Sequence, residues 1–191
     1  MPTAQVRKVR ATITAARMST YDNAVSAGQA RIRRALKLYM WNAEAAGAFL
    51  LPLHLCEVAV RNAVADAIAA QYGSHWPWVT GFQNSLLSPS TGYSPRGDLA
   101  KARYGTTSTG KVIPEVKFVF WQRLFTSRYD NAIWNHQLMA VLPGANAADG
   151  VPAVRTRVFH DLDRIRLLRN RIAHHEPIIA RNLAADLAVL T

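Results

Sequence analysis

The chain has almost no cysteine: Cys56 is the single one among 191 residues. One thiol excludes an intramolecular disulfide framework and any zinc site built on several thiolates. Cys56 lies in an apolar segment, where a small core residue is its simplest role. The six histidines show no spacing typical of a metal site, and neighbours such as His174-His175-Glu176 do not face one point on a helix. We therefore expect neither a metal nor a cofactor.

Long apolar runs are also lacking. The N-terminus has no apolar run of about 7–15 residues, which a signal peptide needs, and no stretch approaches the length of a membrane span. Internal repeats and low-complexity blocks are absent as well. Half of the residues are apolar, enough for a sizeable core. These features predict a cytoplasmic protein that does not contact a membrane, with a single domain over residues 1–191.

Acidic residues are scarce near the N-terminus. Among the first 43 residues only Asp22 is acidic, and the whole chain has 23 Lys and Arg against 12 Asp and Glu, a net charge of +11. A basic surface attracts phosphate backbones, and arginine suits phosphate contact better than lysine does. A solvated surface without a ligand explains the same charge about equally well. The candidate RNA-binding residues are Arg31, Arg33, Arg34 and Lys37.

No segment shows the period-two alternation of a half-buried strand, so the predicted fold class is all-α. Turn-forming residues dominate the segment of about 73–112, which we expect to be a loop-rich insertion between the N- and C-terminal helices. Pro52 lies near the start of one predicted helix and marks its first turn or a kink. The predicted helices cover about 3–18, 23–42, 44–72, 96–104, 114–126, 128–141, 152–175 and 177–190.

The end of the 152–175 helix carries the most informative motif, Arg169-Asn170-Arg171-Ile172-Ala173-His174-His175-Glu176-Pro177. A guanidinium binds a phosphate in bidentate fashion, and an imidazole moves a proton near neutral pH, so these side chains suit a metal-free ribonuclease. Helical periodicity places Arg166, Asn170 and His174 on one face. It places Arg169 within an apolar stripe, where a charge needs a partner.

A second charged residue, Glu57, also lies on an apolar face of a predicted helix, together with Leu50, Leu53, Val60, Val64 and Ile68. Arg61 follows one turn later, within reach of its carboxylate. With Arg169, these two residues form a predicted buried cluster between two helices. The structural alternative is an ion pair that fixes helix packing and does no chemistry.

An aromatic cluster is open to two interpretations. Its rings could stack on nucleobases, but their spacing of three to five residues favours core packing. The cluster comprises Phe118, Phe120, Trp121, Phe125, Tyr129 and Trp134.

Several of these elements, in this order, resemble the Abi-like (abortive infection) branch of the HEPN superfamily. Leu168–Pro177 is similar to the family's Arg-Asn…His-His element, and Glu57–Ala63, which contains Asn62, to its Glu-x-x-x-Arg-Asn element. Tyr72-Gly73-Ser74-His75-Trp76 resembles the Tyr-Gly-x-x-Trp that follows, and Tyr39–Asn42 also looks like the family. The similarity covers about residues 20 to 180.

The resemblance implies a HEPN-like helical bundle that dimerises and sets two motifs side by side in a composite active site. It implies a metal-independent endoribonuclease with an Arg-Asn-x3-His motif, acting in phage defence or as the toxin of a toxin–antitoxin system. Arg169, Asn170 and His174 sit on the motif positions. The expected supporting residues are Glu57, Arg61, Asn62, Arg166 and His175.

The chemistry of these side chains agrees with that implication. The 2′-hydroxyl of RNA can attack its own phosphodiester, so the enzyme needs only proton transfer and charge stabilisation. We expect His174 to act as base or acid, Arg169 to stabilise the charged transition state, and Asn170 to orient the phosphate or the imidazole. DNA lacks the 2′-hydroxyl and should not be cut.

Two alternatives remain at this stage. The first is a non-catalytic RNA- or nucleotide-binding module in which Arg169 binds phosphate and His174 is structural. The second is an interaction protein whose basic surface binds an acidic antitoxin protein or a regulatory RNA.

Overall fold

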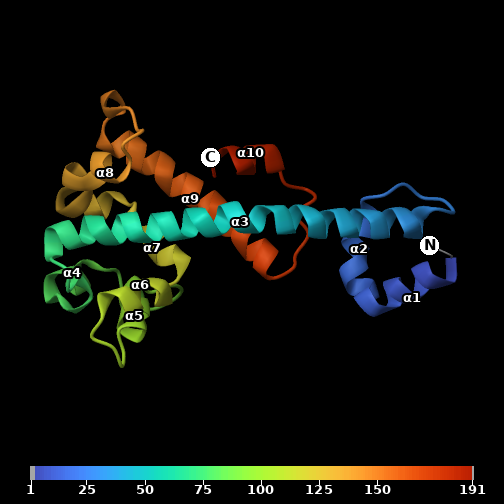
Figure 1. Cartoon of the computed structure of the whole chain (residues 1–191), viewed down its shortest axis with the longest axis horizontal. Helices are drawn as coiled ribbons and strands as arrows, with labels where there is room; N and C mark the ends of the chain where they lie inside the picture. Colours follow the sequence, from blue (N-terminus) through green and yellow to red (C-terminus); the bar gives the residue numbers. More distant parts are fainter. Residues whose placement is uncertain (1–2, 191) are drawn as a thin grey trace. The chain divides into compact units, whose positions relative to one another are not determined.

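The computed structural model describes residues 3–190, is 74% helical and contains no strand within that range (Figure 1), which confirms the predicted all-α class. Three 3₁₀ turns, Trp76–Trp78, Ser127–Tyr129 and Ala147–Asp149, and a π-helical turn, Asp130–Trp134, lie between the α-helices. The α-helices are α1 (Thr3–Ile13), α2 (Ala15–Asn23), α3 (Arg31–Tyr72), α4 (Thr80–Ser85), α5 (Pro95–Ala102), α6 (Thr109–Glu115), α7 (Phe118–Leu124), α8 (Asn135–Val141), α9 (Val151–Ala173) and α10 (Leu183–Ala188).

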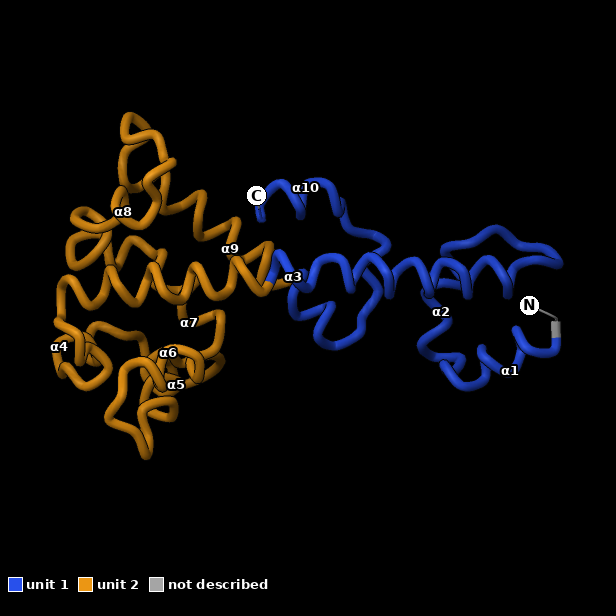
Figure 2. The backbone as a smooth tube through the Cα atoms, viewed as in Figure 1, with its two compact units in different colours: residues 1–53, 168–191 blue, residues 54–167 orange. Residues whose placement is uncertain are grey.

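The chain forms two compact units (Figure 2). Unit 1 combines Met1–Leu53 with Leu168–Thr191, and unit 2 is His54–Leu167. Helices α3 and α9 each contribute to both units, so the boundary falls within continuous helices. The single domain over residues 1–191 stays a prediction.

The long helix α3 replaces two predicted helices. The prediction of helices over 23–42 and 44–72 is wrong, because α3 runs without a break from Arg31 to Tyr72. Asn42 does not end a helix, since its side-chain Oδ1 accepts the Ile178 N–H at 2.7 Å instead of competing for local backbone groups. Pro52 lies inside the helix, where the carbonyl that loses its partner belongs to the exposed Ala48 and can reach water.

The predicted helix over 3–18 is in fact two helices. Helix α1 ends at Ile13, and Thr14 begins α2 with φ 75° and ψ 149°, its hydroxyl accepting the Arg17 N–H at 3.5 Å. Arg10 on α1 donates to Asp22 on α2 through Nη1 at 2.6 Å, so the two helices are held together. These hydrogen bonds hold the pKa of the Asp22 carboxyl below its usual range. The core of unit 1 beneath them consists of Val6, Met18, Tyr21, Ala35 and Leu36.

Unit 2 has an aromatic core. Trp134 stacks on Phe125 with ring centroids 4.3 Å apart, and its indole N–H donates to the Leu124 carbonyl at 2.6 Å. Trp76 meets Trp121 edge to face. All six members of the cluster noted in the sequence are buried, which confirms the core interpretation.

The segment of about 73–112 is more helical than its turn-forming residues suggested. It contains α4, α5 and most of α6, and α5 matches the helix expected near 96–104. Serine and proline, which favour turns, also favour the first positions of a helix. Ser94 caps α5 by accepting the Gly97 N–H at 3.1 Å, and Pro95 is the first residue of that helix. The loop-rich insertion is therefore only partly present.

The last helix, predicted over 177–190, is shorter in the structure, where α10 covers only Leu183–Ala188. Residues before it are held by side chains rather than by helical bonds, since Arg171 donates to the Pro177 carbonyl at 2.7 Å and Asn42 binds the Ile178 N–H.

Cys56 is half-buried on α3; burial, and then the charge of Glu57, raise the pKa of its thiol.

Candidate functional site

Helix α9 ends in a turn that gives its C-terminus a fixed shape. The Glu176 N–H binds the Arg171 carbonyl at 2.7 Å, and the His175 N–H binds the Ile172 carbonyl at 3.0 Å. This pair of bonds is the Schellman motif, whose residue after the cap adopts left-handed backbone angles and is usually glycine. Here that residue is His175, with φ 55°. The predicted helix end at residue 175 moves back to Ala173 for this reason.

The three motif residues lie at the C-terminal end of α9, in unit 1, with Arg169 and Asn170 inside the helix and His174 directly after its last residue, Ala173. Arg169 donates from Nη1 to Asn170 Oδ1 at 3.5 Å, and the His174 N–H binds the Asn170 carbonyl at 3.0 Å. Arg169 and His174 are exposed, and Asn170 is half-buried. The expectation that Arg169 is buried in the apolar stripe is wrong, because Leu168 and Ile172 occupy the buried face.

Glu57 and Arg61 form the predicted ion pair, within unit 2. Arg61 also donates to the Pro114 carbonyl at 2.9 Å, so the pair fastens α3 to the end of α6. The apolar face assigned to Glu57 is only partly buried, since Leu53, Val64 and Ile68 are buried whereas Leu50 is 57% exposed. This arrangement favours the structural role of the pair, and its extension to Arg169 stays a prediction.

The other supporting residues divide between the units. Arg166 belongs to unit 2 and forms an ion pair with Asp163 at 2.7 Å, and Gln122 donates to the same carboxylate at 3.2 Å. Asn62 is exposed on α3. His175, on the terminal turn of α9, lies beside the motif in unit 1.

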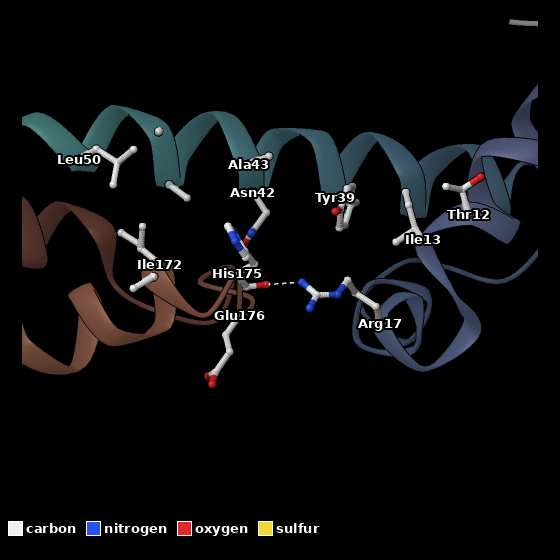
Figure 3. Close-up of a pocket in the computed structure, with 13 residues that line it drawn as sticks. Thr12, Ile13, Arg17, Tyr39, Asn42, Ala43, Leu50, Ile172, His175 and Glu176 are labelled. Carbon is white, nitrogen blue, oxygen red and sulfur yellow. Dashed lines mark hydrogen bonds between the residues drawn. The ribbon is translucent and has the colours of Figure 1, made fainter.

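A cavity of about 680 Å³ lies beside this turn in unit 1 (Figure 3). Figure 3 shows α3 along one side, with Asn42 pointing toward His175 at the end of α9 and Tyr39 lying toward Ile13 and Arg17. A shallower hollow of about 400 Å³ has Arg17, His175 and Glu176 in common with the cavity. The hollow also contains His174, which the cavity does not reach.

Arg17 is the residue that sequence reasoning missed. Its Nη1 donates to the His175 carbonyl at 2.9 Å across 158 positions in the chain (Figure 3). In the sequence it is one of several basic residues near the N-terminus, with no motif around it. Only the folded chain brings its guanidinium to the end of α9.

Backbone strain gathers around the hollow. Within residues 3–190, the non-glycine residues with positive φ are Thr14 and His175, and both line it. Such conformations cost free energy and are concentrated at functional sites. Their coincidence around Arg17 marks this part of unit 1 as the candidate site.

The expected RNA-binding residues on α3 divide into two kinds. Arg31 donates to the Asp22 carbonyl at 3.0 Å, and Arg34 donates to the Ser26 carbonyl at 2.6 Å. These two side chains hold the connection between α2 and α3. Arg33 and Lys37 are exposed. Contact of the four with phosphate stays a prediction.

The expectation that no stretch approaches the length of a membrane span is wrong, because helix α3 is long and apolar enough to cross a membrane. An 18-residue window of α3 has a mean hydropathy of 1.4, and 11% of that window is buried. A core helix of a soluble protein passes the same test, so this is weak support for a membrane span.

Within residues 3–190, no three His, Cys, Asp or Glu side chains gather as metal ligands would.

The candidate site offers an exposed guanidinium, an amide and an imidazole at one helix end, with a second guanidinium, that of Arg17, beside His175. Together they can bind a phosphate and transfer a proton. Comparison with protein-family models, with curated proteins and with solved structures finds no match for this chain.

Proposed function

We propose that this protein is a metal-independent endoribonuclease of the HEPN type, with Arg169, Asn170 and His174 as its catalytic residues. The observation that carries the proposal is that these exposed or half-buried residues follow one another at the C-terminal end of α9, in a unit with marked positive charge, where Arg169 contacts Asn170. The motif order supports the HEPN fold assignment, and the chemistry requires no cofactor.

Each residue has a defined role in the proposed reaction. His174 takes the proton from the 2′-hydroxyl or gives one to the leaving 5′-oxygen. Arg169 neutralises the charge that develops on the phosphate oxygens. Asn170 accepts from Arg169 and keeps the guanidinium in place. The expected products have cyclic-phosphate or 3′-phosphate ends.

We further propose that the active form is a homodimer, because one imidazole cannot easily serve as acid and base in the same step. Exposed apolar side chains on the part of α3 in unit 2 support this: Leu55 and Val58 are 59% and 43% exposed, and their spacing of three places them on one helix face. Leu55→Glu should lower the mass measured by light scattering to that of the monomer and reduce cleavage. A monomeric but active wild type contradicts this part of the proposal.

The test of the nuclease uses the wild type and two variants with total RNA and tRNA in excess EDTA. His174→Ala should abolish cleavage, whereas His160→Ala, an exposed histidine on the same helix, should leave it unchanged. Equal cleavage by all three proteins would assign the activity to another site or to a contaminant. Sequencing the product ends checks for cyclic or 3′-phosphates.

A second candidate function is RNA or nucleotide binding without cleavage, which the cavity beside Arg17 also supports. It predicts that the wild type binds RNA and leaves it intact.

We place the protein in the cytoplasm, acting in phage defence or as a toxin held by an acidic antitoxin protein or a regulatory RNA. Co-purification of such a partner from the host cell is the test of that setting.

A further inference from the structure

We infer that the cavity beside the end of α9 binds one nucleobase of the RNA, while Arg17 binds the neighbouring phosphate. This inference rests on the proposed function and adds a substrate subsite to it. The cavity volume of about 680 Å³ lies within the range of small-molecule sites, and all of its lining residues belong to unit 1.

Part of the wall formed by α3, between Asn42 and Leu50, has small side chains. Ala43, Ala46 and Gly47 line the cavity there, and Ile172 provides an apolar surface on α9 (Figure 3). Glycine is unfavourable inside a helix, so Gly47 needs a reason. A Cβ built at Gly47 meets nothing within 4 Å, so close packing does not require the glycine. Its effect is to leave this part of the cavity wall without a side chain.

Two polar side chains in the cavity have fixed orientations. Asn42 is 6% exposed, and because its Oδ1 accepts the Ile178 N–H at 2.7 Å, the amide nitrogen remains to donate to a ligand. Tyr39 meets Tyr21 edge to face with ring centroids 5.3 Å apart. A nucleobase has both the acceptor atoms that Asn42 would bind and the flat face that Tyr39 would contact.

The phosphate of the same nucleotide would lie at the rim that the cavity and the hollow have in common. Arg17 stands at this rim, and its bond to His175 uses one N–H of a guanidinium that carries several. His174 lies in the hollow on the other side of the rim. Glu176 pairs with Arg171 at 3.4 Å, and Figure 3 shows its carboxylate pointing away from α3. A nucleotide bound in this way brings its phosphate beside the proposed catalytic imidazole.

The experiment fills the cavity without disturbing the motif. Gly47→Leu adds a side chain at an exposed position that lines the cavity, while Ala48→Leu adds a similar side chain at the next position of the same helix, which is also exposed but does not line it. The probes are the four ribonucleoside 3′-monophosphates, titrated by calorimetry. We expect Gly47→Leu to weaken binding of the preferred nucleotide at least tenfold and Ala48→Leu to leave it unchanged. Asn42→Asp keeps the acceptor for Ile178 but removes the amide donor, and should weaken binding as well.

The outcomes separate this inference from the proposed function. Nucleotide binding that Gly47→Leu removes, in a protein that cuts no RNA, would support the subsite and overturn the nuclease. Cleavage with equal kcat/KM in wild type and Gly47→Leu, together with equal nucleotide binding, would overturn the subsite and leave the nuclease standing. Absence of mononucleotide binding by the folded wild type would also overturn the subsite.

Discussion

Of the 17 aromatic side chains, 13 lie in unit 2 and four in unit 1. Charge is distributed the other way: unit 1 has 11 Lys and Arg against four Asp and Glu, and unit 2 has 12 against eight. Unit 2 is thus held by a core of packed rings, and unit 1 combines a small core with a basic surface. Burial of large rings gives most of the free energy of a fold, whereas exposed basic groups attract ligands.

The two units also differ in how distant segments are joined. In unit 1 the segment after α9 is fastened by single hydrogen bonds, such as Asn42 to Ile178 and Arg17 to His175. In unit 2 distant segments are also joined by ring contacts such as Trp76 against Trp121. Single polar contacts open at a lower free-energy cost than a packed core, which suits a site that must admit a substrate.

The largest expected effect tests the aromatic core of unit 2. Trp134→Ala removes a buried indole and its hydrogen bond to Leu124, and should lower the free energy of unfolding by about 3–5 kcal/mol. Trp41→Ala is the matched control in unit 1, where the indole is 46% exposed. Urea denaturation followed by circular dichroism gives both values. Equal losses would remove the distinction between the units.

The second prediction concerns the polar connection in unit 1. Asn42→Ala leaves the buried Ile178 N–H without its acceptor and should lower the free energy of unfolding by about 1–3 kcal/mol. Asn42→Asp keeps an acceptor and should recover most of that loss. Denaturation of the three proteins measures the series, and a fully stable Asn42→Ala would contradict the role given to this bond.

The third prediction separates stability from function at the end of α9. His175→Gly relieves the left-handed strain and should raise the free energy of unfolding by about 1 kcal/mol. His174→Gly, which relieves no strain, should not stabilise the protein. Thermal denaturation distinguishes them. Because the His175 side chain is an expected supporting residue of the site, the more stable variant should cut RNA more slowly than wild type.

The smallest expected effect is a pH dependence within unit 1. Hydrogen bonds from Arg10 lower the pKa of Asp22, so the pair stabilises the fold above the carboxyl pKa of the unfolded chain, about 3.9. That stability is lost as the pH falls through the lower folded pKa. Asp22→Asn should therefore cost about 0.2–1 kcal/mol at pH 7 and less at pH 2. Melting temperatures at the two pH values measure it.

Helix content followed from the sequence more reliably than helix ends. The absence of period-two alternation predicted the all-α class, and the spacing of the aromatic cluster predicted its burial. The predicted break near Asn42 and the helix end at residue 175 were wrong because each depends on a distant or backbone partner. Asn42 is engaged by Ile178, and the Schellman turn ends α9 early.

The sequence by itself determined the helical class and the placing of Asn170 and His174 on one helix face, because residues four apart in a helix are neighbours whatever the rest of the chain does. Tertiary structure alone decided that Arg169 is exposed, that Arg17 meets His175 and that a cavity opens beside Gly47. These depend on contacts between segments far apart in the chain, for which local periodicity carries no information.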